Sequence, residues 1–495
     1  MRTDTTPITS GPAVCGPSLT ERLSRPHLLD VHLPGMTGLA LYLAGAGARV
    51  GASAPLGTDH QLLAEIERSG VRLHRPGSAF RMVGRSCAVW QGADPGPRAV
   101  LDAAGGLGIP VIGRLGALGE LVDHAPVSVA VTGTHSTSMP AAILTSALAH
   151  RNPGWVLNEP PVGAPAGHAS GGGLLIADLG DDNTTHEASV PTAHCTPSVL
   201  LVTGIDANPP HTEDFASALA AAERAARRAS AVVLCVWDQG TRLLWSRLAR
   251  DPGPQVFTVG RDRDADVRLV QQVWSGTDTH ITVQDSSSGE FHQFTLAVPG
   301  RHHALAAAAA FATGLVLGTR GADLAAGISA FRGIDGHLTH TGTQRGVTVM
   351  ASRARHPEEI TADLAAARLL TEGRVLAALE PDGHTRTGAL AHRVGEAVAL
   401  ADHAVLLPVH SLMPGTRLDD ERNAVRHAAI GAGMPPAQLA FLGQGPDAPT
   451  AEQVLARLAA PGDLVLTIGA HTATRLGVRL LHHLTAPDTP IPADL

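Results

Sequence analysis

The stretch that decides the fold runs Val127-Ser-Val-Ala-Val-Thr132, then Gly133-Thr-His-Ser-Thr-Ser-Met-Pro140, then Ala141-Ala-Ile-Leu-Thr-Ser-Ala-Leu-Ala149. Its first part is an apolar run typical of a central strand in a parallel sheet. Its last part has the apolar spacing of a helix. A buried strand that leads through a turn into a helix predicts an α/β domain.

The turn between this strand and this helix is a candidate phosphate site. A helix that starts after such a turn presents unpaired N–H groups and a partial positive charge to an anion. A working P-loop adds Gly-Lys and then Ser or Thr, because lysine neutralises the phosphates and the hydroxyl holds Mg²⁺. Here the Gly-Lys pair falls on Ser136 and Thr137, and Ser138 keeps the hydroxyl. Spacing alone favours a packing role for the turn over phosphate binding.

All 37 basic residues of the 495-residue chain are arginine, because the sequence contains no lysine. This excludes a P-loop lysine, a Schiff-base lysine, a carbamylated lysine and a lysine general base. The 45 acidic residues give a net charge of −8, which argues against nucleic acid or an anionic membrane as a partner. The hydrophobic content of 44% is enough for several cores.

Alternating strands and helices continue on both sides of the central stretch, which predicts three α/β domains in series. A Pro-, Gly- and Thr-rich segment at 1–25 is predicted to be disordered. The N-terminal domain is assigned to 26–125, the central domain to 126–342 and the C-terminal domain to 343–495. Stretches with period-2 alternation over 256–298 predict an antiparallel excursion within the central domain.

Four widely spaced cysteines show no CxxC motif and favour neither a disulfide framework nor a zinc site. We expect buried thiols in a reducing compartment, at Cys15, Cys87, Cys195 and Cys235. The start of the chain lacks the pattern of a signal peptide. The longest apolar run, 304–317, is too short to span a bilayer and predicts a core helix. Together these features predict a cytoplasmic protein.

The order of short motifs along almost the whole chain resembles the Mur ligase family. Gly133-Thr134-His135 stands where the family carries Gly-Thr-His-Gly-Lys-Thr-Thr, and 108–114 is similar to its Gly-Ile-Pro-Val-x-x-Arg. Further similar segments are 27–38, 299–302, 355–359, 381–387 and 464–470. The similarity is greatest to the branch of the family that joins L-alanine to UDP-N-acetylmuramate. So many motifs in one order make the resemblance specific.

The resemblance implies a three-domain α/β fold with a Rossmann-like N-terminal domain, a central P-loop-type ATPase-like domain and a doubly wound C-terminal domain. It implies ATP-dependent amide formation, in which a carboxylate is phosphorylated and an amine then displaces the phosphate. ATP and Mg²⁺ are the implied cofactors, and a nucleotide or UDP-sugar-like molecule is the implied ligand. The implied nucleotide-binding residues are Gly133, Thr134, His135, Ser136, Thr137, Ser138, His302 and Arg386, and the implied metal ligands are Ser138 and Asp178.

Several positions depart from the family's pattern in ways that affect this chemistry. Thr137 takes the place of the P-loop lysine, and Ile176 takes that of a magnesium-binding glutamate. Asn208-Pro209 replaces a metal-ligating Asp-His pair. The segment 30–33 replaces the Gly-x-Gly-Gly that admits uridine diphosphate, where the carboxylate of Asp30 would repel a pyrophosphate. One lost cationic donor costs about 10²–10³ in rate, although such losses do not simply multiply.

Other polar clusters have plainer interpretations. Adjacent histidines on a helix point in different directions, so we expect solvated faces at His302-His303 and His482-His483. The alternating charges at 262–266 are expected to form an exposed turn, and the acidic run at 419–421 a solvated face.

The departures lead to the prediction of a divergent paralogue without ligase activity, which acts as a binding or regulatory protein for a nucleotide or a protein partner. No catalytic residue is assigned. The alternative is an ATP-dependent amide ligase that acts on UDP-N-acetylmuramate and L-alanine in peptidoglycan synthesis, or on another acid and amine. Phosphate release that depends on the amine distinguishes the two.

Overall fold

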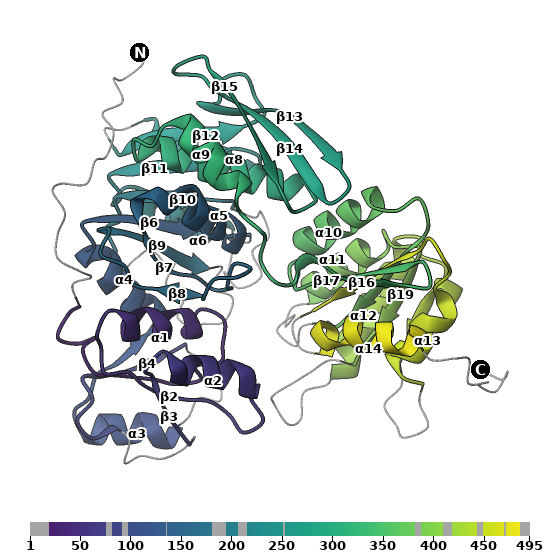
Figure 1. The fold of residues 1–495 in the computed structure, drawn as a ribbon, viewed down its shortest axis with the longest axis horizontal. Coiled ribbons are helices and arrows are strands. Elements are labelled where there is room, and N and C mark those ends of the chain that lie inside the picture. The colour runs from purple at the N-terminus through teal and green to yellow at the C-terminus, as the bar shows by residue number, and fades with distance from the viewer. Residues whose placement is uncertain are drawn as a thin grey trace. The chain divides into compact units, whose positions relative to one another are not determined.

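The computed structural model of the chain describes residues 19–75, 82–91, 98–134, 136–180, 195–205, 215–250, 253–381, 388–408, 418–442, 449–469 and 472–485. Within these residues the strands form sheets of five, ten and six strands, with helices packed against them (Figure 1). The chain divides into two compact units. The first unit contains the five-stranded sheet and nearly all of the ten-stranded sheet, and it consists of Met1–Val273, Thr279–Ala297 and His303–Ile334. The second contains the six-stranded sheet and consists of Trp274–Asp278, Val298–His302 and Asp335–Leu495.

The five-stranded sheet is parallel and has the strand order β3-β2-β1-β4-β5. The chain adds strands on one side of β1 and then crosses to the other side, which gives the first five strands of the Rossmann order 3-2-1-4-5-6. This order confirms the Rossmann-like N-terminal domain. Its elements are β1 (Pro26–Leu28), α1 (Met36–Gly45), β2 (Gly51–Ser53), α2 (His60–Arg68), β3 (Arg72–His74), β4 (Cys87–Trp90), α3 (Arg98–Gly106), β5 (Val111–Gly113) and α4 (Arg114–His124).

Part of the segment predicted to be disordered packs against this domain. Residues 1–18 lie outside the described residues, but residues 19–25 are placed. Leu23 is completely buried, and Arg22 forms an ion pair of 2.7 Å with Glu120 of α4. The described part of this segment therefore belongs to the folded domain, because an apolar anchor and an ion pair hold it there.

The ten-stranded sheet has the order β15-β14-β13-β12-β11-β10-β6-β9-β7-β8. Its inner strands, from β9 through β12, run parallel. Its elements are β6 (Val127–Thr132), α5 (Ser138–Ala147), β7 (Gly154–Val156), β8 (Gly167–His168), β9 (Leu174–Gly180), β10 (Val199–Val202), α6 (Phe215–Ala226), β11 (Ala231–Cys235), α7 (Gln239–Leu248), β12 (Gln255–Gly260), β13 (Val267–Ser275), β14 (Asp278–Asp285), β15 (Phe291–Leu296), α8 (Arg301–Val316) and α9 (Gly321–Ser329).

Strand β6 has the bounds that its sequence predicts, and all of its residues are buried. It pairs with β10 on one side and β9 on the other, so it needs an apolar run rather than an alternating pattern. The predicted antiparallel excursion is confirmed for β14 and β15. It is wrong for β12 and β13, since β12 runs parallel to β11 and β13 runs parallel to β12.

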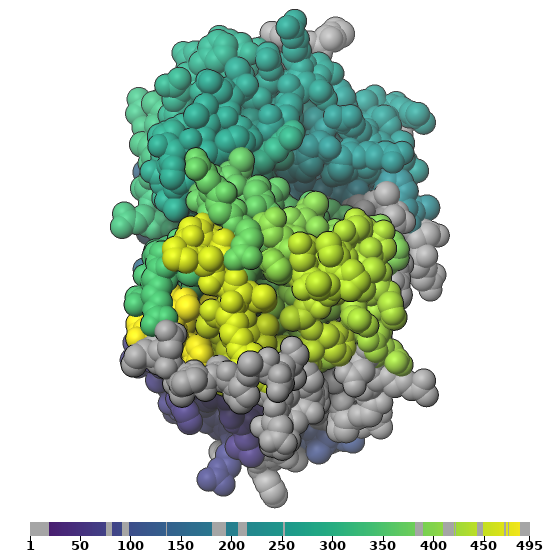
Figure 2. All heavy atoms as spheres, turned by 90° about the vertical axis from the view of Figure 1, so that its right-hand side faces the viewer, coloured from purple at the N-terminus to yellow at the C-terminus, as the bar shows by residue number. Residues whose placement is uncertain are grey.

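The six-stranded sheet has the order β16-β17-β21-β18-β19-β20, with β16 antiparallel to β17 and the remaining pairs parallel. It starts at His337, before the predicted domain boundary at 343, because β16 pairs with β17. Its elements are β16 (His337–Gln344), β17 (Val347–Ser352), α10 (Pro357–Leu369), β18 (Val375–Leu379), α11 (Gly388–Val398), β19 (His403–Leu406), α12 (Leu418–Gly431), β20 (Leu439–Phe441), α13 (Ala451–Leu458), β21 (Leu464–Ile468) and α14 (Thr472–Thr485). On the face drawn in Figure 2, the green to yellow atoms of the second unit pack closely against one another.

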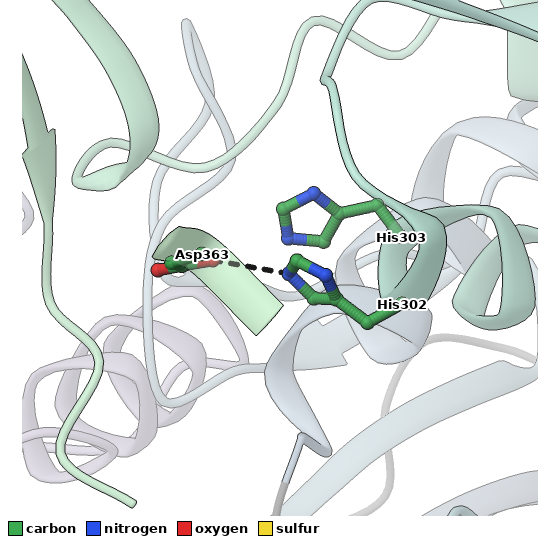
Figure 3. Close-up of side chains that lie close together, drawn as sticks. All are labelled: His302, His303 and Asp363. Carbon is green, nitrogen blue, oxygen red and sulfur yellow. Dashed lines mark ion pairs between the residues drawn. The ribbon is translucent and has the colours of Figure 1, made fainter. Parts of the chain in front are cut away.

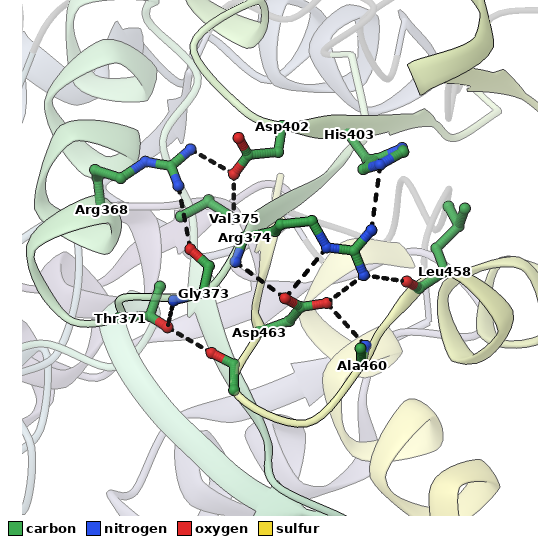
Figure 4. A network of polar contacts seen from close by, with 11 residues as sticks. Arg368, Thr371, Gly373, Arg374, Val375, Asp402, His403, Leu458, Ala460 and Asp463 are labelled. Atoms are coloured by element: carbon green, nitrogen blue, oxygen red, sulfur yellow. Dashed lines mark hydrogen bonds and ion pairs between the residues drawn. The ribbon is translucent and has the colours of Figure 1, made fainter.

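A polar network joins the segments that lead into β18 and β21 (Figure 4). The Arg374 guanidinium donates to both carboxylate oxygens of Asp463, at 3.3 Å from Nε and 2.6 Å from Nη2. Arg374 Nη2 also donates to the Leu458 carbonyl oxygen. Burial raises the pKa of Asp463, but hydrogen bonds from Arg374 and Ala460 and the charge of Arg374 outweigh burial and hold that pKa below its ordinary value. The network fixes the amino ends of these parallel strands.

The described cysteines, Cys87, Cys195 and Cys235, are free and buried, as predicted. Burial raises the pKa of the Cys87 thiol to about 12, so this thiol is inert at neutral pH. Cys15 lies outside the described residues. None of the helices in the described part of the chain has the length and apolar character needed to cross a membrane.

Candidate nucleotide-binding site

The turn after β6 is held against the chain that leaves β10. Gly133 lies so close to Thr203 that a Cβ would overlap the Thr203 hydroxyl, and therefore only glycine fits. The Thr134 N–H donates a hydrogen bond of 3.1 Å to the Gly204 carbonyl oxygen. These contacts fix the start of the turn at the carboxyl ends of parallel strands, where open α/β sheets bind their ligands.

The end of the turn has a glycine-like backbone at a residue that is not glycine. Ser136 has a φ of 59°, in the left-handed region that favours glycine. Thr137 follows as the N-cap residue of α5, but its side chain makes no cap hydrogen bond. The Thr137 side chain is buried instead and hydrogen bonds to Asp178.

Asp178, in β9, is completely buried and receives hydrogen bonds from this turn. Ser138 Oγ donates to Asp178 Oδ2 at 3.1 Å, and the Gly180 N–H donates to Oδ1 at 3.0 Å. Burial raises the pKa of Asp178 above its ordinary value, while the charge of Arg114 and the hydrogen bonds from Thr137, Gly180 and Ser138 oppose that rise. The structure thus brings the two predicted metal ligands, Ser138 and Asp178, into contact.

The buried cation at this site is Arg114, which comes from the N-terminal domain. It is the first residue of α4, directly after β5, and only 4% of its surface is exposed. Its guanidinium donates to the carbonyl oxygens of Asp178, at 2.8 Å, and Leu179, at 3.3 Å. It also donates to Asn158 Oδ1 at 2.5 Å. Sequence reasoning missed Arg114 and Asn158 as site residues; the available signal was the arginine that ends the 108–114 motif.

The residues present fit a magnesium ion in part. Mg²⁺ prefers oxygen ligands and is usually bound by one or two carboxylates together with water and phosphate oxygens. Ser138 and Asp178 supply a hydroxyl and a carboxylate, and the N-terminus of α5 supplies N–H groups for a phosphate. Ile176 lies completely buried in β9 and has no side-chain oxygen, and Thr137 brings no positive charge.

The loop after β1 also has a glycine-like backbone at a non-glycine residue. Asp30 has a φ of 53°. It lies in the N-terminal domain, where the family's pattern has the first glycine of its glycine-rich loop. Burial raises the pKa of Asp30, and the charge of His32 partly opposes this. That Asp30 repels a pyrophosphate stays a prediction.

The predicted nucleotide contact His302 lies in the second unit. His302 Nε2 is 3.1 Å from a carboxylate oxygen of Asp363 on α10 (Figure 3). Asp363 also accepts a hydrogen bond of 2.6 Å from the Ser352 hydroxyl, at the end of β17. The expected solvated face at His302-His303 is wrong, because His302 has this partner and only 2% of His303 is exposed.

The other polar clusters lie where they were expected, or outside the described residues. His482 and His483 are exposed on α14, and Asp262 and Asp264 are exposed in a turn. The predicted contacts His135 and Arg386, together with Asn208-Pro209, lie outside the described residues. Asp420 of the acidic run is exposed.

Comparisons with known proteins identify the family to which this chain is related. A family model described as "Mur ligase, glutamate ligase domain" matches residues 338–471. The UDP-N-acetylmuramate–L-alanine ligase of Streptomyces avermitilis is 31% identical to this chain over 486 residues, which cover 95% of this chain and 99% of that protein. The chain belongs to the Mur ligase family. The resemblance inferred from the order of motifs is thereby confirmed.

Solved Mur ligases confirm the three-domain α/β fold. The UDP-N-acetylmuramate–alanine ligase of Thermotoga maritima superimposes with a TM-score of 0.72 at 19% identity, covering 92% of this chain and 98% of that one. A murein peptide ligase of Psychrobacter arcticus superimposes with a TM-score of 0.70 at 18% identity, covering 94% of this chain and 99% of that one. The five-stranded parallel sheet of this Mur ligase family member matches the Rossmann-like domain that the motifs imply.

Proposed function

We propose that the chain is an ATP-dependent ligase that joins the carboxylate of UDP-N-acetylmuramate to L-alanine in the cytoplasm, as a step of peptidoglycan synthesis. The observation that carries this proposal is the end-to-end match to a ligase of that name, at 31% identity. The contact between Ser138, the first residue of α5, and Asp178 in β9 supports it, because a hydroxyl and a carboxylate close together suit the magnesium ion of a nucleotide. This proposal replaces the predicted loss of activity as the leading interpretation.

Each domain and several residues of the candidate site would have a distinct role in this reaction. Bound ATP supplies the phosphoryl group that activates the acid, and Ser138 and Asp178 would hold its Mg²⁺. The first N–H groups of α5 would face the phosphates. Gly133 lets the turn approach the chain at Thr203, and Arg114 holds the main chain of Asp178 in place. In this arrangement the domain at 26–125 would bind the UDP-sugar, 126–342 the nucleotide, and 343–495 the amino acid.

We propose that the ligase is slow, because Thr137 lacks the positive charge of the lysine that the family's pattern has at this position. Catalysis of phosphoryl transfer depends on positive charge around the transferred group, and one missing donor costs about 10²–10³ in rate. The hydroxyl of Thr137 supplies no charge and is already hydrogen bonded to Asp178. We therefore expect measurable but low turnover, with Mg²⁺ and the helix N-terminus providing the remaining charge stabilisation.

The test is phosphate release by the purified protein with ATP, Mg²⁺ and UDP-N-acetylmuramate, measured with and without L-alanine. We expect release that depends on the amine. Ser138→Ala should lower it at least tenfold, since the metal loses a ligand. Ser146→Ala is the matched control on the same helix, because Ser146 hydrogen bonds to the Gly327 carbonyl oxygen and not to Asp178. Equal rates for the unmodified protein and Ser138→Ala would contradict the proposal.

A second candidate is a non-catalytic paralogue that binds a nucleotide, a UDP-sugar-like molecule or a protein partner. The specific observation in its favour is that Thr137 and Ile176 occupy positions where the family's pattern has a lysine and a metal-binding glutamate. This candidate predicts no amine-dependent phosphate release, and its nucleotide-binding form also predicts ATP binding by calorimetry. Release above background from the unmodified protein would exclude it.

A further inference from the structure

Arg114 is one of two arginines that are buried among the residues the structure describes, the other being Arg422. Burying a cation is costly unless its N–H groups find acceptors. Arg114 meets this need with two main-chain carbonyl oxygens, of Asp178 and Leu179, and with the side chain of Asn158. Because two of these acceptors belong to the main chain of β9, the hydrogen bonds from Arg114 restrain the backbone at Asp178 and Leu179.

The three acceptors of Arg114 named above come from Asp178 itself and from residues next to it. Two of them belong to Asp178 and Leu179, and the third residue, Asn158, donates its own backbone N–H to Asp178 Oδ2 at 3.4 Å. The guanidinium therefore orients the strand end that carries the carboxylate and the segment that caps one of its oxygens. Ser138 approaches the same oxygen, Oδ2, from the turn.

The Arg114 guanidinium also packs closely against Gly35, in the loop after β1 of the N-terminal domain. A Cβ at Gly35 would overlap the guanidinium, so this position must remain glycine while Arg114 stays where it is. The Gly35 N–H donates a hydrogen bond of 3.2 Å to the Asn158 carbonyl oxygen. Arg114 and the loop after β1, which both belong to the N-terminal domain, thus contact Asn158 of the central domain.

We infer that Arg114 is a positioning residue of the nucleotide site, which holds Asp178 in the orientation that lets its carboxylate and Ser138 share a metal ion. The inference rests on the proposed function for the metal, but the positioning itself can be tested without nucleotide. Residues that orient metal ligands typically change metal affinity by about 10–100-fold when they are replaced. Loss of Arg114 should therefore weaken the metal-dependent part of ATP binding more than the metal-independent part.

The first experiment is amide hydrogen exchange of the full chain with Arg114→Gln. Exchange should become about tenfold faster in 154–158 and 174–180, while 199–202 in β10 stays unchanged. Arg22→Gln is the matched control, since Arg22 makes an exposed ion pair with Glu120 of the same helix α4. Unchanged exchange at 154–158 and 174–180 in Arg114→Gln would overturn the inference, whether or not the protein binds ATP.

The second experiment measures ATP affinity with and without Mg²⁺ by calorimetry. In Arg114→Gln, the gain in affinity that Mg²⁺ provides should fall at least tenfold, with recovery of part of that gain in Arg114→Lys. Equal losses with and without Mg²⁺ would mean a merely structural role and would overturn the inference. If the unmodified protein does not bind Mg-ATP, the proposed function fails, and the exchange experiment alone decides whether Arg114 holds Asp178. Asn158→Ala, which keeps the cation, replaces Arg114→Gln if the latter does not fold.

Discussion

The residues of the candidate site keep a glycine-like backbone while their side chains differ from the family's pattern. Ser136 and Asp30 have φ values of 59° and 53°, and both stand where that pattern has glycine. A side chain in this left-handed region costs about 1 kcal/mol relative to glycine. The turn stays in this shape because its first residues, Gly133 and Thr134, are held against Thr203 and Gly204.

Ser136→Gly should therefore raise the free energy of unfolding by about 1 kcal/mol, because it removes this strain. Urea unfolding followed by circular dichroism measures the change. Ser146→Gly is a control with the opposite sign, because it places glycine in the last turn of α5 and also removes the hydrogen bond from Ser146 to the Gly327 carbonyl oxygen, so it should cost at least about 1 kcal/mol. A loss of stability in Ser136→Gly would show that the side chain of Ser136 contributes more than its backbone conformation costs.

Motif position was enough to predict which residues form the turn, but not which residue from another domain supports it. Ser138 and Asp178 could be paired from the family's pattern, and the structure places them in contact. Arg114 is separated from Asp178 by 64 residues, and such a contact leaves no local pattern in the sequence. The burial of an arginine becomes visible only when the packing of the two domains is known.

The sequence predicts elements well where burial is two-sided and poorly where it is not. Strands β6 and β9 are buried along their whole lengths, so their apolar runs identify them. Strand β16 is mostly half-buried or exposed at the edge of its sheet and has few apolar residues, so only its pairing with β17 defines it. Strands β7 and β8 escape prediction because three and two residues in a Gly- and Pro-rich stretch are too few to show a strand pattern.

The ion pair of Arg374 with Asp463 should make the stability of the domain that contains the six-stranded sheet depend on pH. The pKa of Asp463 is lower in the folded chain than its ordinary value of 3.8. A lowered pKa contributes stability above the unfolded value, and this contribution is lost as the pH falls through the folded value. Asp463→Asn should cost about 1–2 kcal/mol at neutral pH, because Asp463 is nearly buried while Arg374 is 40% exposed and solvent screens part of the attraction. The difference from the unmodified protein should shrink below pH 3.8.

Urea unfolding of both proteins at neutral and acidic pH checks this expectation. Arg368→Gln is the control, because its ion pair with Asp402 is more exposed and should contribute less than about 1 kcal/mol. A constant difference between Asp463→Asn and the unmodified protein down to the lowest pH would show that the effect of the substitution does not come from the charge of Asp463.

At the scale of the whole molecule, the absence of lysine and the full-length similarity to a ligase point in different directions. Composition removes the P-loop lysine, and this led to the prediction of lost activity. The similarity extends over 95% of the chain, and the relative is named as a ligase, which favours the ligase interpretation. The three-domain fold could be predicted because its motifs are spread along the chain, whereas activity depends on charges at a few positions.

Replacing Ser136 by glycine and Thr137 by lysine in one variant separates these interpretations. If the chain is a slow ligase, Ser136→Gly with Thr137→Lys should raise amine-dependent phosphate release by about 10²–10³, because the transferred phosphate regains its cation. Arg345→Lys, in the hairpin turn between β16 and β17, is the control for lysine as such and should leave the rate unchanged. If the unmodified protein and the double variant both bind ATP yet neither releases phosphate, the missing lysine is not what limits this chain. The defect would then lie in the remaining metal and substrate positions, and the non-catalytic candidate would stand.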